Sequence, residues 1–167
     1  MNLVVNVTKN WGIGYQNQLL VSISQDLRRF RSLTEGKTVI LGRKTLETFP
    51  GRRPLKNRTN IIMSTNRDFS AEGARTVHGV EELKKAIENL PSENIFVIGG
   101  ASVYEELLPY CHRAYVTMTD VILPADRFFP DLDRLPDWKR ESASPAMTEG
   151  HLTFRYLQYI HEKEKEL

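Results

Sequence analysis

One carboxylate, Asp26, falls where the hydrophobic pattern of the chain predicts an apolar side chain. Residues 23–33 carry apolar side chains at helical spacing, namely Ile23, Leu27, Phe30 and Leu33. This is the pattern of an amphipathic helix, and Asp26 lies on its apolar face. Removal from water disfavours the charged form of a carboxylate, so a group in this position is suited to hold and release a proton as a general acid.

A second interpretation of Asp26 is structural. The acid follows Ser22 and Ser24 near the expected start of the helix. Acidic side chains in a first helical turn favour the helix dipole and cap free N–H groups. This segment alone favours capping over chemistry, and other motifs in the chain reverse that preference.

The glycine pair Gly99–Gly100 lies between an apolar run and a helical pattern within residues 95–108. Glycines in such a turn let the backbone approach a ligand closely, and the free N–H groups of the helix start attract phosphate. The spacing differs from the GxGxxG turn of dinucleotide-binding folds and lacks the lysine of a P-loop. A tight strand-to-helix connection is the alternative interpretation.

A basic pair, Arg43 and Lys44, follows the predicted strand 37–41 and opens a short predicted helix. Ser64 and Thr65 follow the next strand of the chain in the same way. The carboxyl ends of parallel strands meet at one edge of a sheet, where helix N-termini attract anions. These cations and hydroxyls therefore form a candidate site for a phosphomonoester.

The elements that must position these residues alternate between strand and helix patterns. Strands are predicted at 2–8, 37–41, 59–63, 74–77, 94–98 and 114–119, and helices at 23–33, 43–49, 80–90 and 101–108. A glycine-rich loop at 9–18 precedes the helix with Asp26 and can serve as a lid. Late runs at 138–141 and 151–160 are predicted as antiparallel edge strands.

This order predicts an α/β fold, in which a mostly parallel mixed sheet of about eight strands has about four helices on its two faces. We expect one domain over residues 1–160, followed by a charged, frayed tail at 161–167.

Composition narrows the possible functions. The chain has 167 residues, of which 40% are hydrophobic, and a net charge of +2, which is too balanced for nonspecific binding of nucleic acid. No apolar run has membrane-spanning length, and four His and one Cys show no metal-ligand spacing. The single Cys111 excludes an internal disulfide and is expected to be a buried small residue. We expect a cytoplasmic protein without a metal, nucleic-acid or membrane partner.

Together these motifs resemble dihydrofolate reductase. The resemblance runs from Val4 to about Tyr159, and its segments keep the order and spacing of that family: WGIG, DLRRF, GRKT, PLKNRTNIIMS, VIGGASVYE, YVTMTD and DRFFP. It implies reduction of 7,8-dihydrofolate to 5,6,7,8-tetrahydrofolate with NADPH, by transfer of a hydride to pterin C6 and a proton to N5. It also implies small-molecule ligands only, among them antifolate inhibitors, and we expect a monomer.

The resemblance assigns roles around the pterin. Asp26 would bind the 2-amino group and the N3 side and assist protonation at N5, while Thr117 would bind both that carboxylate and the amino group. Phe30 would line the pocket beside the p-aminobenzoyl ring, and Arg58 would pair with the α-carboxylate of the glutamate. Without the motifs, Thr117 would be interpreted as a packed strand residue, Phe30 as a core residue and Arg58 as a solvated loop arginine. Apolar walls would come from Val4, Val5, Leu27, Phe49, Leu55 and Ile98.

The resemblance also assigns a cofactor site. Gly99 and Gly100 would be joined by a cis peptide bond and would embrace the dinucleotide together with the residues up to Tyr104. The basic pair and the two hydroxyl residues would meet the adenosine and its 2′-phosphate, which favours NADPH over NADH. The full set is Asn6, Ile13, Gly14, Asn17, Leu19, Arg43, Lys44, Thr45, Ser64, Thr65, Gly99, Gly100, Ala101, Ser102, Val103 and Tyr104.

Three positions depart from the family pattern. Val21 stands where a tryptophan usually helps to hold a water near the pterin, and valine cannot form that hydrogen bond. Asn6 stands where a small alanine is usual beside the nicotinamide, so its side chain adds bulk or a polar contact. Leu46 replaces a frequent aromatic residue, which is a change in packing. We hypothesise that the first two departures shift the affinity for antifolates.

Two other functions compete with this interpretation. A pyrimidine reductase of riboflavin synthesis would resemble the fold and use NADPH, but is not expected to keep Asp26, Thr117 and Arg58 in this pattern. A nucleotide-binding module without catalysis would be consistent with the departures at Val21 and Asn6. The intact acid argues against that second alternative.

Overall fold

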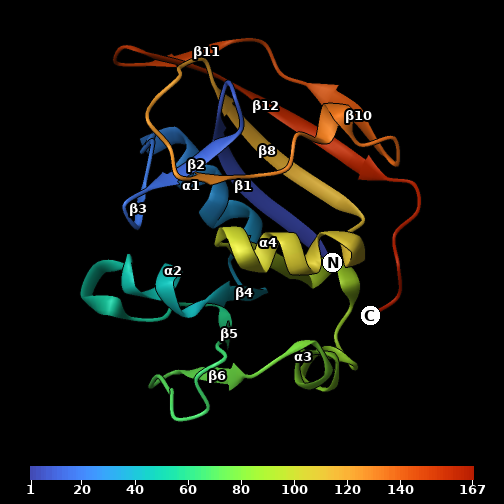
Figure 1. The fold of residues 1–167 in the computed structure, drawn as a ribbon. Helices are drawn as coiled ribbons and strands as arrows, with labels where there is room; N and C mark the ends of the chain where they lie inside the picture. Colours follow the sequence, from blue (N-terminus) through green and yellow to red (C-terminus); the bar gives the residue numbers. More distant parts are fainter.

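A nine-stranded sheet runs through the molecule in the order β10–β12–β8–β1–β7–β4–β5–β6, with β11 paired to β12 (Figure 1). The computed structural model describes residues 1–167. The strands of this sheet are β1 (Asn2–Thr8), β4 (Thr38–Gly42), β5 (Thr59–Met63), β6 (Ala74–Val77), β7 (Ile95–Gly99), β8 (Arg113–Thr119), β10 (Trp138–Ala143), β11 (Met147–Glu149) and β12 (Leu152–His161).

The pairing within this sheet confirms the predicted fold class. All neighbours from β8 to β6 in this order are parallel, whereas β12 pairs antiparallel with β8, β10 and β11. Parallel strands covered by helices on both faces are continuous apolar runs, which explains why they could be read from the sequence.

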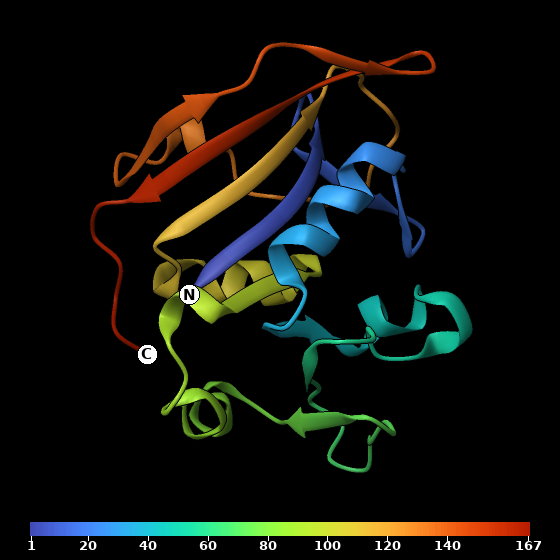
Figure 2. The same cartoon turned by 180° about the vertical axis from the view of Figure 1, so that it is seen from behind.

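Helices α1 (Ser24–Thr34) and α4 (Ala101–Leu107) cover opposite faces of the sheet (Figures 1 and 2). Helices α3 (Val80–Ile87) and α4 pack into a core cluster of 24 buried residues, whereas α2 (Arg43–Glu47) adds Leu46 to a cluster of only five on the other face. Alternate residues of β1 divide between the faces, because Leu3, Val5 and Val7 enter the larger cluster. The face that carries α1 is therefore the less completely covered one.

A second, three-stranded sheet was not predicted. It has the order β3–β2–β9 and comprises β2 (Gly12–Tyr15), β3 (Gln18–Leu19) and β9 (Arg127–Phe128). The prediction of a loop over 9–18 was therefore wrong for residues 12–15 and 18, which are half of that segment. Gln16 and Asn17 have positive φ angles of 50° and 61°, as a tight hairpin turn requires. The third strand comes from a distant part of the chain, which no local pattern reveals.

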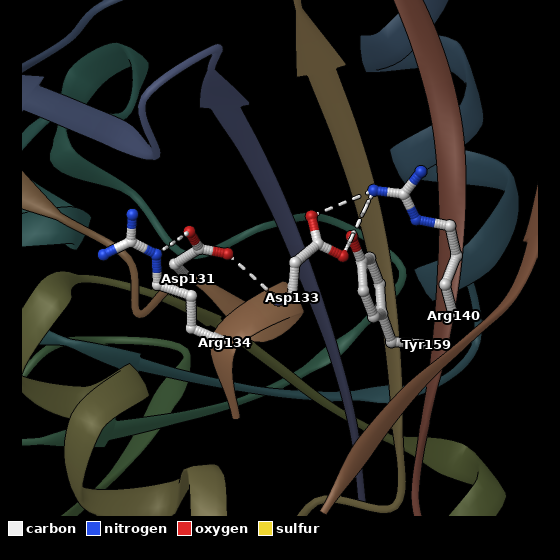
Figure 3. A network of polar contacts seen from close by, with 5 residues as sticks. All are labelled: Asp131, Asp133, Arg134, Arg140 and Tyr159. Atoms are coloured by element: carbon white, nitrogen blue, oxygen red, sulfur yellow. Dashed lines mark hydrogen bonds and ion pairs between the residues drawn. The ribbon is translucent and has the colours of Figure 1, made fainter. Parts of the chain in front are cut away.

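The antiparallel edge is fixed by a polar network (Figure 3). The Tyr159 hydroxyl on β12 donates to Asp133 Oδ1 at 2.9 Å and accepts from Arg140 on β10 at 3.1 Å. Arg140 also binds both oxygens of Asp133. Asp133 lies in the short helix η4 (Leu132–Arg134), whose turn is capped by Asp131. The network ties this helix to the two edge strands.

The C-terminal tail contacts the body of the molecule, unlike the frayed tail that we expected. The Lys165 amide donates to the Pro109 carbonyl at 2.8 Å, and Leu167 packs against the larger cluster. Cys111 is fully buried in that cluster, and burial raises its pKa to about 12, so it is a buried small residue as predicted. None of the helices combines the length and the apolar composition needed to span a membrane.

Candidate active site

Asp26 is held by side chains from two neighbouring strands. Its Oδ1 accepts a hydrogen bond from Thr117 Oγ1 on β8 at 2.5 Å, and its Oδ2 accepts one from Asn6 Nδ2 on β1 at 3.0 Å. Asn6 and Thr117 are paired in the parallel register of β1 and β8, so they point to the same face of the sheet. The structure thus brings together Asp26 and Thr117, and it adds Asn6 to them.

The helix that carries Asp26 is capped by another acid. The backbone N–H groups of Ser24 and Gln25 donate to Glu149 at 2.6 and 3.1 Å, and these hydrogen bonds lower the pKa of Glu149. No side chain of α1 itself caps its start. The capping interpretation of Asp26 was therefore wrong, and its carboxylate is directed at the sheet instead.

Asp26 has no cationic partner. Arg29, one turn along the same helix, stacks on the ring of Tyr156 at 3.9 Å from its centroid and forms no ion pair with the carboxylate. Burial lowers the pKa of Arg29, and the nearby Tyr156 and Asp26 oppose that shift. A half-buried carboxylate held by neutral donors keeps acceptor sites for a ligand.

Most of the predicted apolar walls lie together on the face that carries α1. Val4, Phe49, Leu55 and Ile98 are partly buried and pack against the smaller core cluster. Phe30 is half-buried, whereas Leu27 is 56% exposed, so the prediction that the apolar face of this helix is buried was wrong for Leu27. These residues present open apolar surface near the acid, which a ligand can cover.

Val5 departs from the other predicted walls. Its side chain is buried in the larger cluster on the opposite face, because it follows Val4 by one position in a strand. Its side chain is therefore part of the core, and only its backbone faces the site.

Arg58 directly precedes β5 and contacts the C-terminal end of α1. Its Nε donates to the Lys56 carbonyl at 2.9 Å, and one terminal nitrogen donates to Thr34 Oγ1 at 3.2 Å. Partial burial lowers its pKa, and it forms no ion pair. A guanidinium has five N–H donors, so the remaining ones are available to an anionic ligand.

A cavity of about 560 Å³ separates the β2–β3 hairpin from α2. The predicted cofactor residues Asn17, Leu19 and Lys44 line it. Arg43 lies beside it and pairs with Glu47 at 2.8 Å. Four further lining residues were missed, namely Gln18, Glu47, Thr48 and Arg52. The basic run at 52–58 was the signal that could have indicated Arg52.

The peptide bond between Gly99 and Gly100 is cis, as the resemblance implies. A Cβ atom on Gly100 would lie 3.1 Å from Thr45 Oγ1, and one on Gly99 would lie 3.5 Å from the same atom. The absence of side chains therefore lets the end of β7 approach α2 closely. This bare backbone cradle beside cationic residues fits the phosphate groups of a dinucleotide.

The remaining predicted cofactor residues differ in exposure. Ala101 and Ser102 open α4 at the surface, whereas Val103 and Tyr104 are buried, and the Tyr104 hydroxyl donates to the Val4 carbonyl at 2.6 Å. The side chains of Val103 and Tyr104 therefore serve the core. The others are half-buried in β2, as for Ile13 and Gly14, or lie just beyond β5, as for Ser64 and Thr65.

His78 is a candidate functional residue that was not predicted from the sequence. Its Nδ1 lies 2.8 Å from the Ser64 carbonyl, beyond the ends of the paired strands β5 and β6. The sequence signal for His78 was its position directly after the predicted strand 74–77, just as Ser64 and Thr65 directly follow the predicted strand 59–63.

Comparisons with known proteins agree with this geometry. The family model for dihydrofolate reductase matches residues 1–162. The dihydrofolate reductase of Staphylococcus haemolyticus is 31% identical over 163 residues, which cover 98% of this chain and 95% of that protein. The dihydrofolate reductase of Bacillus subtilis (strain 168) is 33% identical over 152 residues, which cover 91% and 88%. A solved dihydrofolate reductase from Enterococcus faecalis, complexed with NADP(H) and RAB-propyl, has a TM-score of 0.85 and 32% identity over 96% of this chain and 95% of that one.

Proposed function

Since the chain belongs to the dihydrofolate reductase family and is an NADPH-dependent oxidoreductase that reduces 7,8-dihydrofolate to 5,6,7,8-tetrahydrofolate, we propose that Asp26 is the acid of this reaction. The reaction converts the N5=C6 double bond to a single bond by adding a hydride at C6 and a proton at N5. The observation that carries this assignment is the carboxylate itself, half-buried and held by Thr117 and Asn6 without a cation.

Asp26 and Thr117 bind the pterin. An ionised carboxylate has about four lone-pair sites, and Thr117 and Asn6 take two of them. The other sites accept the N–H donors at N3 and at the 2-amino group. With a proton taken up from water, Asp26 is the source of the proton at N5.

The rest of the substrate extends along α1. Leu27 and Phe30 contact the p-aminobenzoyl ring, and Arg58 pairs with the α-carboxylate of the glutamate through its unused donors. The open apolar surface of Val4, Phe49, Leu55 and Ile98 supports this path because a bound ligand removes it from water.

The cavity and the glycine cradle hold NADPH, which supplies the hydride when it is bound. Gly99 and Gly100 bring the backbone close to the dinucleotide, and Lys44 and Arg43 attract its phosphates. Ser64 and Thr65 lie at the neighbouring strand end, where they donate to the 2′-phosphate.

We further propose that the protein is a cytoplasmic monomer whose single domain covers residues 1–160. The single cysteine, which cannot form an internal disulfide, supports the cytoplasmic assignment. Antifolate inhibitors occupy the pterin site, since they offer the same pattern of N–H donors to Asp26.

The test is the oxidation of NADPH with and without dihydrofolate, followed at the nicotinamide absorbance band. The wild type should consume NADPH only with dihydrofolate, and Asp26→Asn should lose most turnover near neutral pH while still binding NADPH. Asp137→Asn is the matched control, because that acid pairs with Lys163 at 3.5 Å beside the antiparallel edge, outside the proposed site. Unchanged turnover of Asp26→Asn across the pH range would refute the assignment, and turnover of an aminopyrimidine in place of dihydrofolate would contradict the substrate.

A further inference from the structure

Asn6 contacts the acid directly, although the sequence analysis grouped it with the cofactor site. Its side chain is half-buried, and its Nδ2 donates to Asp26 Oδ2 at 3.0 Å. Its Oδ1 accepts a hydrogen bond from Thr119 Oγ1 at 3.2 Å. The amide therefore bridges a fully buried threonine and the carboxylate.

The two partners fix the orientation of the amide. An ionised carboxylate only accepts hydrogen bonds, so Asn6 must present its NH2 group to Asp26. Its oxygen then faces Thr119, whose hydroxyl can donate. The opposite orientation would place two acceptor oxygens against each other. Thr117 and Thr119 are alternate residues of β8, so the strand supplies both the second carboxylate contact and the group that orients the amide.

A donor aimed at a carboxylate favours its ionised form. Asp26 interacts electrostatically with three ionisable groups, namely Arg29 on the same helix, Tyr156 on β12 and Tyr104 on α4. None of these three forms a hydrogen bond with the carboxylate. The tyrosines are neutral near pH 7, since the ordinary pKa of a phenol is 10 and burial raises the pKa of both. Asn6 and Thr117 are thus the side chains that contact the carboxylate directly.

We propose that Asn6 is a positioning residue for the reaction: its amide, oriented by Thr119, holds the carboxylate of Asp26 and moves the pH range of activity downward. The inference rests on the proposed role of Asp26. Activity is lost as pH rises and the acid ionises, so a contact that favours the ionised form places that loss at lower pH. Removal of the amide should move the loss to higher pH.

The test is the pH dependence of kcat/KM for dihydrofolate in Asn6→Ala. A hydrogen bond to a charged group contributes about 1.5–3 kcal/mol, and 1.4 kcal/mol corresponds to one pH unit, so the midpoint of the loss should rise by about one unit or more. Thr119→Val should move it in the same direction by less, whereas Thr119→Ser keeps the hydroxyl and should leave it in place. Titration of the Asp26 carboxyl by ¹³C NMR in the ligand-free protein should show the same shifts.

Asn2→Ala is the matched control, because Asn2 lies on the same strand but binds backbone carbonyls of residues 93 and 95. Its loss should lower the melting temperature without moving the midpoint. A midpoint in Asn6→Ala equal to that of wild type would overturn the proposal, as would an equal shift in Asn2→Ala. Asp26→Asn in the same buffers distinguishes a failure of the proposed function of Asp26 from a failure of the proposed role of Asn6. If Asp26→Asn stays active with the wild-type midpoint, the proposed function of Asp26 fails. If it is inactive and Asn6→Ala does not shift, only the role of Asn6 fails.

Discussion

Glu149 on β11 caps α1, the helix that carries Asp26, since its carboxylate accepts a hydrogen bond from the Ser24 amide at 2.6 Å. The two residues are separated by 125 positions in the chain. The contact joins the outermost strand to the first turn of α1 and satisfies N–H groups that would otherwise lack partners. It also leaves Asp26, two residues further on, without a capping role.

We expect Glu149→Gln to lower the melting temperature at pH 7. The hydrogen bonds hold the pKa of Glu149 below its ordinary value of 4.5. A lowered folded-state pKa stabilises the fold above the unfolded value and loses that contribution as pH falls through the folded value. The difference between wild type and variant should therefore shrink below pH 4.5, as thermal unfolding followed by circular dichroism would show. Glu88→Gln, at an exposed helix end, should show no such difference; an equal effect in both would contradict the cap.

Tyr159→Phe should destabilise the antiparallel edge. Loss of the hydroxyl removes its bonds to Asp133 and Arg140, at a cost of about 1 kcal/mol, which lowers the melting temperature by about 2–4 °C. Burial raises the pKa of Tyr159 to about 12, so its contribution is complete below pH 10 and is lost as pH rises toward 12. Tyr110→Phe is the control. If the melting temperature of the wild type stayed above that of Tyr159→Phe at pH values above 12, the proposed contribution of the network would be contradicted.

Replacement of the basic pair at α2 should weaken selection for the phosphorylated cofactor. In Arg43→Gln with Lys44→Gln, KM for NADPH should rise about tenfold or more while KM for NADH changes little, because the charge-assisted contacts of both residues with the 2′-phosphate are lost. The effect should decrease at high salt. The same charge change at Lys84 and Lys85 on α3 is the control. Equal losses for NADPH and NADH would exclude a role in recognising the 2′-phosphate.

Arg58→Lys should weaken binding of the glutamate part of the substrate. A lysine cannot reproduce the bidentate guanidinium contact, so KM for dihydrofolate should rise about tenfold. KM for a dihydropterin without the glutamate should stay the same. Arg53→Lys, in the exposed loop nearby, is the matched variant. An equal increase for both substrates would show that Arg58 acts on the fold and not on the carboxylate.

Much of the fold followed from local patterns. The apolar runs at 37–41 and 94–98 became central parallel strands because burial on both faces selects continuous apolar residues. The small sheet of β2, β3 and β9 was missed because its third strand is two residues long and lies over 100 positions from its partner. Leu27 was misjudged because periodicity shows which residues share a helix face, and not whether other elements cover it.

The α/β class and the membership in a reductase family could be predicted from the sequence alone, because ordered motifs and strand periodicity are properties of the chain. The pairing of Asp26 with Thr117 was predicted only through the resemblance to that family. That Glu149 caps α1 and that Asn6 binds Asp26 became apparent only in the folded chain. Both contacts join residues that are distant in the chain, and they depend on the strand order and the parallel register of β1 with β8. Register turns each side chain to one face of the sheet or the other, so it selects the partners of a buried carboxylate.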